Sequence, residues 1–123
     1  MDTLFVKVAG ATYNNRQAYL SRLRGDEPCR IDPEPDNPYD KNALAVRCVS
    51  TDGVVHLGYV PRDLAAQIAP LLEGEALMVT IDAITGGFEL EDGSLANLGL
   101  VLKVEVPSAD DDVYSSEDQS IPF

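Results

Sequence analysis

Several residue types that carry chemistry in proteins are scarce in this chain of 123 residues. It has no tryptophan, a single histidine (His56), and two cysteines, Cys29 and Cys48, far apart in the sequence. A structural zinc site needs about four Cys or His ligands, so this inventory predicts no metal site and no cofactor. We expect both cysteines to be buried thiols in a reducing compartment.

The sequence also lacks the segments that direct a chain to a membrane. No apolar run approaches the ~20 residues of a membrane span. The N-terminus, MDTLFVKVAG, has neither the charged start nor the long apolar core of a signal peptide. We therefore expect a cytoplasmic protein with no membrane partner.

Catalytic patterns are scarce as well. There is no glycine-rich phosphate loop, and no serine or cysteine stands beside an evident base. The acids Glu89 and Glu91 alternate along an apparent strand, which favours a solvated face over a catalytic pair. The sequence predicts a protein that is not an enzyme, with no catalytic residues.

Basic residues are few and unevenly distributed. Nine Lys and Arg stand against 21 Asp and Glu, for a net charge of −12. Residues 1–62 hold eight acids and eight bases, residues 63–106 hold eight acids and Lys103 alone, and residues 107–123 hold five acids and no base. Phosphates are bound by cations, so only the N-terminal half is suited to face a nucleic acid.

The patterns that are present predict a small, mostly β domain. Apolar residues make up 45% of the chain, enough for one core. Two helices are expected, one from Asn14-Asn15 towards Gly25 and one from Pro61 to Gly74. The strands expected from alternation and turn signals cover residues 4–8, 30–31, 43–49, 54–60, 77–84, 88–90 and 98–106. This order fits a β-barrel, modified OB- or SH3-like, with one or two short helices.

The composition changes after Pro107. Residues 107–123 are acidic and Ser-rich and lack an apolar pattern, up to a terminal Ile121-Pro122-Phe123. We therefore expect a folded domain over residues 1–106 and a flexible acidic tail over residues 107–123.

The segment NPYDKNALAV, residues 37–46, resembles the signature of the HIRAN family. Three further features agree in order and spacing: VAG at residues 8–10, GYVPR at 58–62, and DLAAQIAPLL at 63–72. The resemblance covers about residues 4–106. It implies a modified OB barrel that captures single-stranded DNA by its free 3′-hydroxyl end and has no catalytic activity.

The resemblance also implies a role for individual residues. Tyr13 and Tyr39 would stack on the terminal bases, and Asp40 would accept a hydrogen bond from the 3′-hydroxyl. Asn37 would contact a base or sugar edge, and Arg62 would meet a phosphate. Stacking suits any base and is worth ~1–3 kcal/mol per base. A carboxylate accepts a hydrogen bond from a terminal hydroxyl and repels a phosphate, which lets a site read an end instead of a sequence.

Three positions depart from the family pattern. Tyr59 occupies a place that is basic or histidine in the family, and we count it among the predicted DNA-binding residues. Thr12 and Asn14 stand where the family member best known for DNA-end binding has an arginine and an aromatic. These changes remove phosphate contacts and alter the predicted pocket.

The same residues have simpler interpretations. Asp40 and Asn42 are of the type that caps a turn through backbone hydrogen bonds. Tyr39 would then be half-buried packing at the barrel mouth, and Arg62 a solvated residue in the first turn of a helix.

The tip Ile121-Pro122-Phe123, after an acidic stretch, resembles the tail of bacterial single-stranded DNA-binding proteins. Such tips dock on repair and replication enzymes. Phe123 would fill an apolar pocket while its α-carboxylate meets a cation. The simpler interpretation is a solvated acidic terminus.

Two functions are compatible with these patterns. The leading hypothesis is a non-catalytic module of DNA repair, replication or phage biology that binds 3′ single-stranded ends and recruits DNA-processing enzymes through its tail. The alternative is an acidic interaction or inhibitor protein that binds such enzymes, through the tail or by imitating DNA, without binding DNA itself.

Overall fold

The computed structural model describes residues 2–13, 15–74 and 77–106 of the chain. Within these ranges it contains six strands and two helices, which confirms the predicted mostly β class. In chain order the elements are β1 (Asp2–Lys7), α1 (Arg16–Ser21), β2 (Cys29–Pro33), β3 (Leu44–Ser50), β4 (Gly53–Tyr59), α2 (Arg62–Gly74), β5 (Met78–Thr85) and β6 (Gly99–Val106). The predicted tail, residues 107–123, lies outside the described residues.

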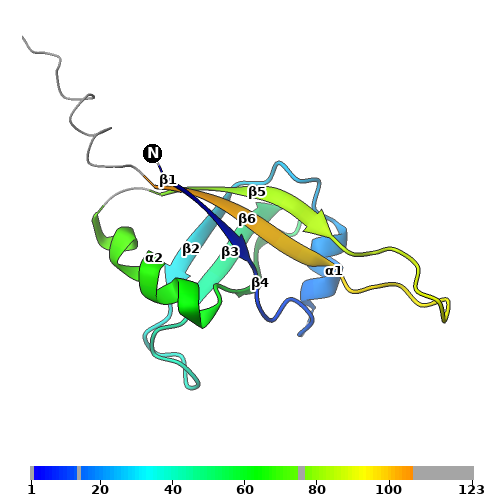
Figure 1. The fold of residues 1–123 in the computed structure, drawn as a ribbon, viewed down its shortest axis with the longest axis horizontal. Helices are drawn as coiled ribbons and strands as arrows, with labels where there is room; N and C mark the ends of the chain where they lie inside the picture. The colour runs from blue at the N-terminus through cyan, green and yellow to red at the C-terminus, as the bar shows by residue number, and fades with distance from the viewer. Residues whose placement is uncertain (1, 14, 75–76, 107–123) are drawn as a thin grey trace, which may run out of the picture.

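The strands form two antiparallel sheets of three, in the orders β1-β6-β5 and β2-β3-β4 (Figure 1). The sheets are joined just after β1, where the Ala9 amide donates to the Tyr59 carbonyl at 2.8 Å and the Tyr59 amide donates to Ala9 at 2.9 Å. The predicted barrel is thus open: two packed sheets share one short backbone connection among the described residues, and no continuous ladder runs around them.

The core lies between the two sheets and is closed by the two helices. On β6 every second residue is buried, as expected for a strand with one face inward. Ile68 of α2 is fully buried and Leu20 of α1 is 1% exposed, so both helices contribute to the same core. Burying one such side chain is worth about 1.5–3 kcal/mol. The predicted helical spacing of Leu64 and Ile68 is confirmed.

Three predictions about local structure are corrected. The two cysteines are joined in a disulfide and are not free thiols, because the β2–β3 register sets Cys29 directly opposite Cys48. Helix α1 begins directly after Asn15, as predicted, but ends at Ser21, earlier than predicted; Asn14 lies outside the described residues. The predicted strand at residues 88–90 is reduced to a single bridge between Glu89 and Leu95.

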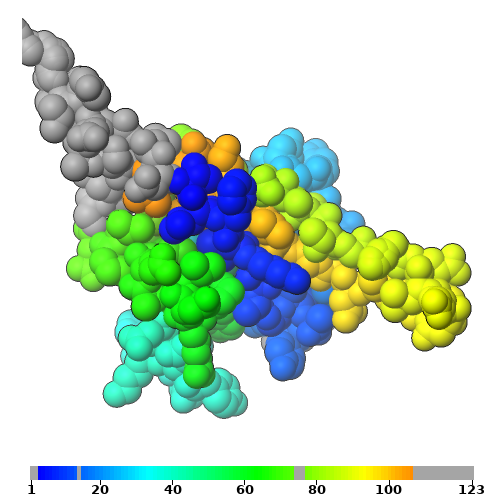
Figure 2. All heavy atoms as spheres, viewed as in Figure 1, coloured from blue at the N-terminus to red at the C-terminus, as the bar shows by residue number. Residues whose placement is uncertain are grey.

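That bridge belongs to an arm, residues 86–98, which projects from the body between β5 and β6 (yellow in Figures 1 and 2). The Leu90 amide donates to the Ser94 carbonyl at 2.7 Å, and the Ala96 amide donates to Phe88 at 2.9 Å. Phe88, Leu90 and Leu95 are 58%, 44% and 66% exposed. The arm therefore presents apolar side chains that the body does not cover.

Gly58 is required by the connection between the sheets. Its φ is +147°, and a Cβ there would overlap the Ala9 carbonyl oxygen and a Val8 methyl group. We expect Gly58→Ala to lower the free energy of unfolding by roughly 2–6 kcal/mol, the sum of backbone strain and overpacking at about 1–3 kcal/mol each. Urea denaturation measures this change.

Gly53 provides the matched control. Its φ is +91°, but a Cβ there would meet nothing within 4 Å. Gly53→Ala therefore carries the strain alone, roughly 1–3 kcal/mol. Equal losses for the two variants would show that the close approach at Ala9 contributes nothing.

In the described ranges, neither helix is long and apolar enough to cross a membrane.

Candidate nucleic-acid interface

An open groove of about 1270 Å³ runs between the segment after β1, the loop after β2 and the end of β4. The six residues predicted to bind DNA come from three separate parts of the sequence, and all of them line this groove. They are Tyr13, Asn37, Tyr39, Asp40, Tyr59 and Arg62. The fold therefore brings the whole predicted set together.

The loop after β2, residues 34–43, is closed by backbone pairing at its base and by one side chain at its tip. The Glu34 amide donates to the Ala43 carbonyl at 2.9 Å, extending the β2–β3 ladder. At the tip, Asn37 Oδ1 accepts hydrogen bonds from the amides of Tyr39, at 2.8 Å, and Asp40, at 3.1 Å. Asn37 thus holds the loop in shape, and its predicted contact with a base or sugar stays a prediction.

The two stacking candidates are exposed. Tyr39 is 90% exposed and Tyr13 is 67% exposed. The interpretation of Tyr39 as half-buried packing is therefore wrong. Neither ring is held inside the core, so both faces can be covered by a ligand with little cost to the fold.

The carboxylate of Asp40 divides its two oxygens between two tasks. Oδ1 accepts the backbone amide of Asn42 at 2.9 Å, which is the turn-capping role. Oδ2 lies 3.5 Å from Arg62 Nε, and the Arg62 side chain is 82% exposed. The turn uses only one carboxylate oxygen, and the other is paired with the exposed Arg62.

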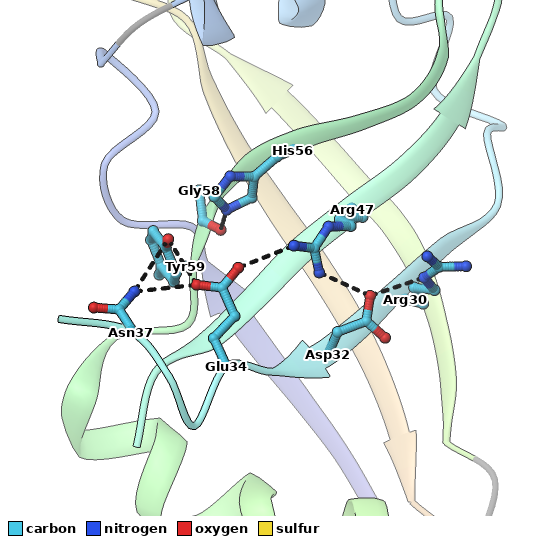
Figure 3. Close-up of polar contacts among 8 residues, drawn as sticks. All are labelled: Arg30, Asp32, Glu34, Asn37, Arg47, His56, Gly58 and Tyr59. Atoms are coloured by element: carbon cyan, nitrogen blue, oxygen red, sulfur yellow. Dashed lines mark hydrogen bonds and ion pairs between the residues drawn. The ribbon is translucent and has the colours of Figure 1, made fainter. Parts of the chain in front are cut away.

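A chain of polar contacts runs from the groove across the sheet β2-β3-β4 (Figure 3). The Tyr59 hydroxyl donates to Glu34 Oε1 at 3.0 Å, and the Asn37 amide nitrogen donates to the same oxygen at 3.1 Å. Arg47 donates to Glu34 Oε2 at 2.9 Å and to Asp32 Oδ2 at 3.0 Å. The floor of the groove is therefore tied to the middle strand of the sheet.

The ionisation of this chain follows from its contacts. Burial alone would raise the pKa of Glu34, but hydrogen bonds from Asn37, Tyr59 and Arg47 outweigh it, so the net pKa is lowered. Burial and the Glu34 carboxylate raise the pKa of Tyr59. At neutral pH Glu34 is thus an anion that accepts from a protonated phenol.

A sequence model of the HIRAN domain family matches residues 1–86 of this chain. The chain belongs to the HIRAN domain family. HIRAN domains are DNA-binding modules without catalytic activity of their own, which supports the predicted non-catalytic DNA-binding domain.

The chain is also similar to two helicase-like transcription factors and to one solved domain structure. Helicase-like transcription factor from Mus musculus is 31% identical over 77 residues, which cover 63% of this chain and 7% of that protein. The same protein from Oryctolagus cuniculus is 32% identical over 77 residues with the same coverage. The chain thus matches a small part of these relatives. The crystal structure of the HIRAN domain of human HLTF aligns with a TM-score of 0.48 at 20% identity, over 82% of this chain and 74% of that one.

Two residues of this HIRAN groove were missed by the sequence analysis. Arg16, at the start of α1, is only 8% exposed and donates to the Gly10 carbonyl at 2.6 Å. Its guanidinium carbon lies 5.5 Å from the centre of the Tyr59 ring. The second is Glu34, whose role depends on contacts far apart in sequence. In the sequence, the only sign that Arg16 belongs to the groove is its position three residues after Tyr13.

Thr12 is exposed, and Asn14 lies outside the described residues. Position 12 therefore supplies no cation to this surface. Arg16 places a cation beneath the groove instead, in contact with Tyr59.

His56 makes the stability of the domain depend on pH. Burial lowers its pKa below the ordinary 6.5, and the nearby Arg16 and Arg47 charges lower it further, although Glu34 opposes them. The unfolded chain then takes up a proton first as the pH falls through 6.5. The His56 contribution is fully present above 6.5 and is lost as the pH falls towards the folded pKa.

We therefore expect the free energy of unfolding to be smaller at about pH 5.5 than at about pH 7.5, and His56→Gln to reduce this difference. Urea denaturation at the two pH values measures it. Glu34 and Asp32 have lowered pKa values, so their contributions are lost only below about 4.5 and 3.8, outside this window. An undiminished difference in the variant would assign the pH dependence to another group.

Proposed function

We propose that this HIRAN domain binds single-stranded DNA by its free 3′-hydroxyl end, in the groove that Tyr13, Tyr39 and Asp40 line. The observation that carries the proposal is that two exposed tyrosines, the Asp40 carboxylate and the exposed Arg62 with which it pairs all line one groove. Sites that bind single-stranded nucleic acids commonly combine aromatic side chains, on which bases stack, with nearby cations.

Each side chain has a chemical task in this proposal. Tyr39 and Tyr13 stack on the terminal bases, and Arg62 turns from Asp40 to the nearest phosphate. The move releases Asp40 Oδ2, which is the oxygen not used by the turn. Asp40 Oδ2 then accepts a hydrogen bond from the terminal 3′-hydroxyl. A 3′-phosphate would place negative charge against this carboxylate, so the site would reject it.

The experiment compares strands with and without ends. A labelled linear oligonucleotide with a 3′-hydroxyl is bound to the protein, and unlabelled linear or circular single strands of equal length compete. We expect the linear competitor to displace the probe and the circle to fail. Equal competition would mean that the groove reads single strands but not ends.

We propose a role in DNA repair or replication for the tail, whose tip Ile121-Pro122-Phe123 lies outside the described residues. Its acidic and apolar composition suits an apolar pocket rimmed by Lys or Arg on a DNA-processing enzyme. Removing the three residues should abolish capture of such an enzyme while DNA binding stays intact. Unchanged capture would leave the tail as a solvated terminus.

One observation favours the alternative, an acidic interaction protein. The projecting arm combines exposed Phe88, Leu90 and Leu95 with Glu89, Glu91 and Asp92. Exposed apolar side chains on such a projection are typical of protein contacts. Two results together would favour the alternative. The protein would bind no single strand, and the double variant Phe88→Ser, Leu95→Ser would no longer capture a DNA-processing enzyme that the protein without its tail tip still captures.

A further inference from the structure

Glu34 is the point at which the loop of the DNA-binding groove is tied to the sheet (Figure 3). It follows the last residue of β2, is partly buried, and uses both carboxylate oxygens. Oε1 accepts from the Tyr59 hydroxyl at 3.0 Å and from Asn37 Nδ2 at 3.1 Å, and Oε2 accepts from Arg47 at 2.9 Å. Three donors from three parts of the chain thus converge on one anion.

The contact with Asn37 has a geometric consequence. An amide has a donor end and an acceptor end, and an ionised carboxylate can only accept. Glu34 therefore turns the nitrogen of Asn37 towards itself, and the oxygen must face the other way. That oxygen accepts the backbone amides of Tyr39 and Asp40, at 2.8 and 3.1 Å. The carboxylate, together with the Tyr59 hydroxyl 3.4 Å from the same nitrogen, thus fixes the orientation of the amide that holds Tyr39 and Asp40.

We propose that Glu34 is a positioning residue of the 3′-end site, which acts through Asn37 on the backbone of Tyr39 and Asp40. Its effect on DNA binding rests on the proposed function, whereas its effect on the loop is a property of the DNA-free protein. Arg47 and Tyr59 hold the carboxylate in place, and Arg47 is in turn fixed by Asp32.

The sign of the effect on DNA distinguishes positioning from simple electrostatics. Removing a negative charge beside a polyanion should by itself tighten binding. A residue that holds the loop in its binding conformation should weaken binding when it is changed, despite the lost charge. Glu34→Gln keeps the size of the side chain but turns one acceptor into a donor, which must then face an N–H donor of either Asn37 or Arg47.

Asp36 offers the matched control in the same loop. It is exposed, and within the described residues its side chain makes no hydrogen bond or ion pair. Asp36→Asn removes the same charge without touching the contacts of Asn37. We expect it to bind DNA equally well or more tightly than the unaltered protein.

The first measurement is amide hydrogen exchange on the DNA-free protein. In Glu34→Gln we expect the Tyr39 and Asp40 amides to exchange about 2–10-fold faster, the size of one lost hydrogen bond. Asp36→Asn should leave both rates unchanged. Unchanged rates in folded Glu34→Gln would overturn the proposal, even if the protein binds no DNA.

The second measurement is the affinity for a 3′-hydroxyl single strand, in a double-mutant cycle with Asn37→Ala. If Glu34 acts through Asn37, Glu34→Gln weakens binding about 2–10-fold in the unaltered protein but adds nothing to Asn37→Ala. Additive losses, or tighter binding in Glu34→Gln, would overturn the proposal. Asn37→Ala alone should accelerate exchange of the same two amides. Unchanged rates in this variant would also overturn the proposal, so the test does not depend on the folding of Glu34→Gln.

Discussion

Asp40→Asn is expected to remove the preference of the protein for a 3′-hydroxyl over a 3′-phosphate. Asparagine keeps an acceptor for the Asn42 amide, so the turn should survive. Its other end presents a donor in place of Asp40 Oδ2, the acceptor that Arg62 releases in the proposed complex. A hydrogen bond to a charged group is worth about 1.5–3 kcal/mol, so binding of the hydroxyl end should fall roughly ten- to a hundredfold.

The phosphate end should behave differently. Without the Asp40 charge, repulsion of a terminal phosphate disappears, so its affinity should stay the same or rise. Fluorescence anisotropy with both strands gives the ratio. Asp36→Asn serves as the control for a charge removed from the same loop, and it should keep the preference. If Asp40→Asn loses affinity equally for both strands, the carboxylate supports the loop and does not read the end.

The second large effect is expected from Tyr39→Ala. Stacking on a base is worth about 1–3 kcal/mol, so affinity for single strands should fall roughly 5–150-fold. The side chain is 90% exposed, so the free energy of unfolding should change by less than about 0.5 kcal/mol. We therefore expect Tyr39→Ala to lose DNA affinity while its free energy of unfolding stays nearly unchanged. Fluorescence anisotropy and urea denaturation on the same preparation measure the two quantities.

Two variants bracket this result. Tyr39→Phe keeps the ring and should retain most of the affinity. Phe88→Ala removes another exposed aromatic, on the projecting arm and outside the groove lining, and should leave DNA binding unchanged. A loss of affinity in Phe88→Ala as large as in Tyr39→Ala would mean that exposed aromatics act without regard to the groove.

The elements best predicted from the sequence are those with strong local signals. The Asp52-Gly53 pair predicted the hairpin between β3 and β4, and Gly53 has the positive φ of such a turn. Pro61 predicted the start of α2, which begins at Arg62. In both cases the decisive residues are neighbours in the chain, so local stereochemistry is sufficient.

The features that escaped prediction depend on register and packing between distant segments. The disulfide follows from the pairing that sets Cys29 opposite Cys48, which no local pattern reveals. The predicted barrel is open because, in the part of the chain that the structure describes, the two sheets are joined only where Ala9 meets Tyr59, a contact across fifty residues of chain. An alternating strand pattern indicates which face is buried but not which strand lies alongside.

The groove shows the same division. The family resemblance predicted six of the residues that line the groove, because a long ordered motif keeps its geometry. The way those residues are held was not predictable, since Glu34 acts through donors from β3, β4 and its own loop. Capping and end-reading were weighed as alternatives for Asp40, but a carboxylate has two oxygens, and the cap uses only one of them.

The proposed function requires the groove to bind a strand with a free 3′-hydroxyl more tightly than one with a 3′-phosphate. Fluorescence anisotropy of one short single strand, with a 3′-hydroxyl or a 3′-phosphate, tests it most directly when done at low and at physiological salt. We expect tighter binding to the hydroxyl end at both salt concentrations, because the difference arises at Asp40 and not from the total charge. Equal binding to the two ends, or binding to neither, would contradict it.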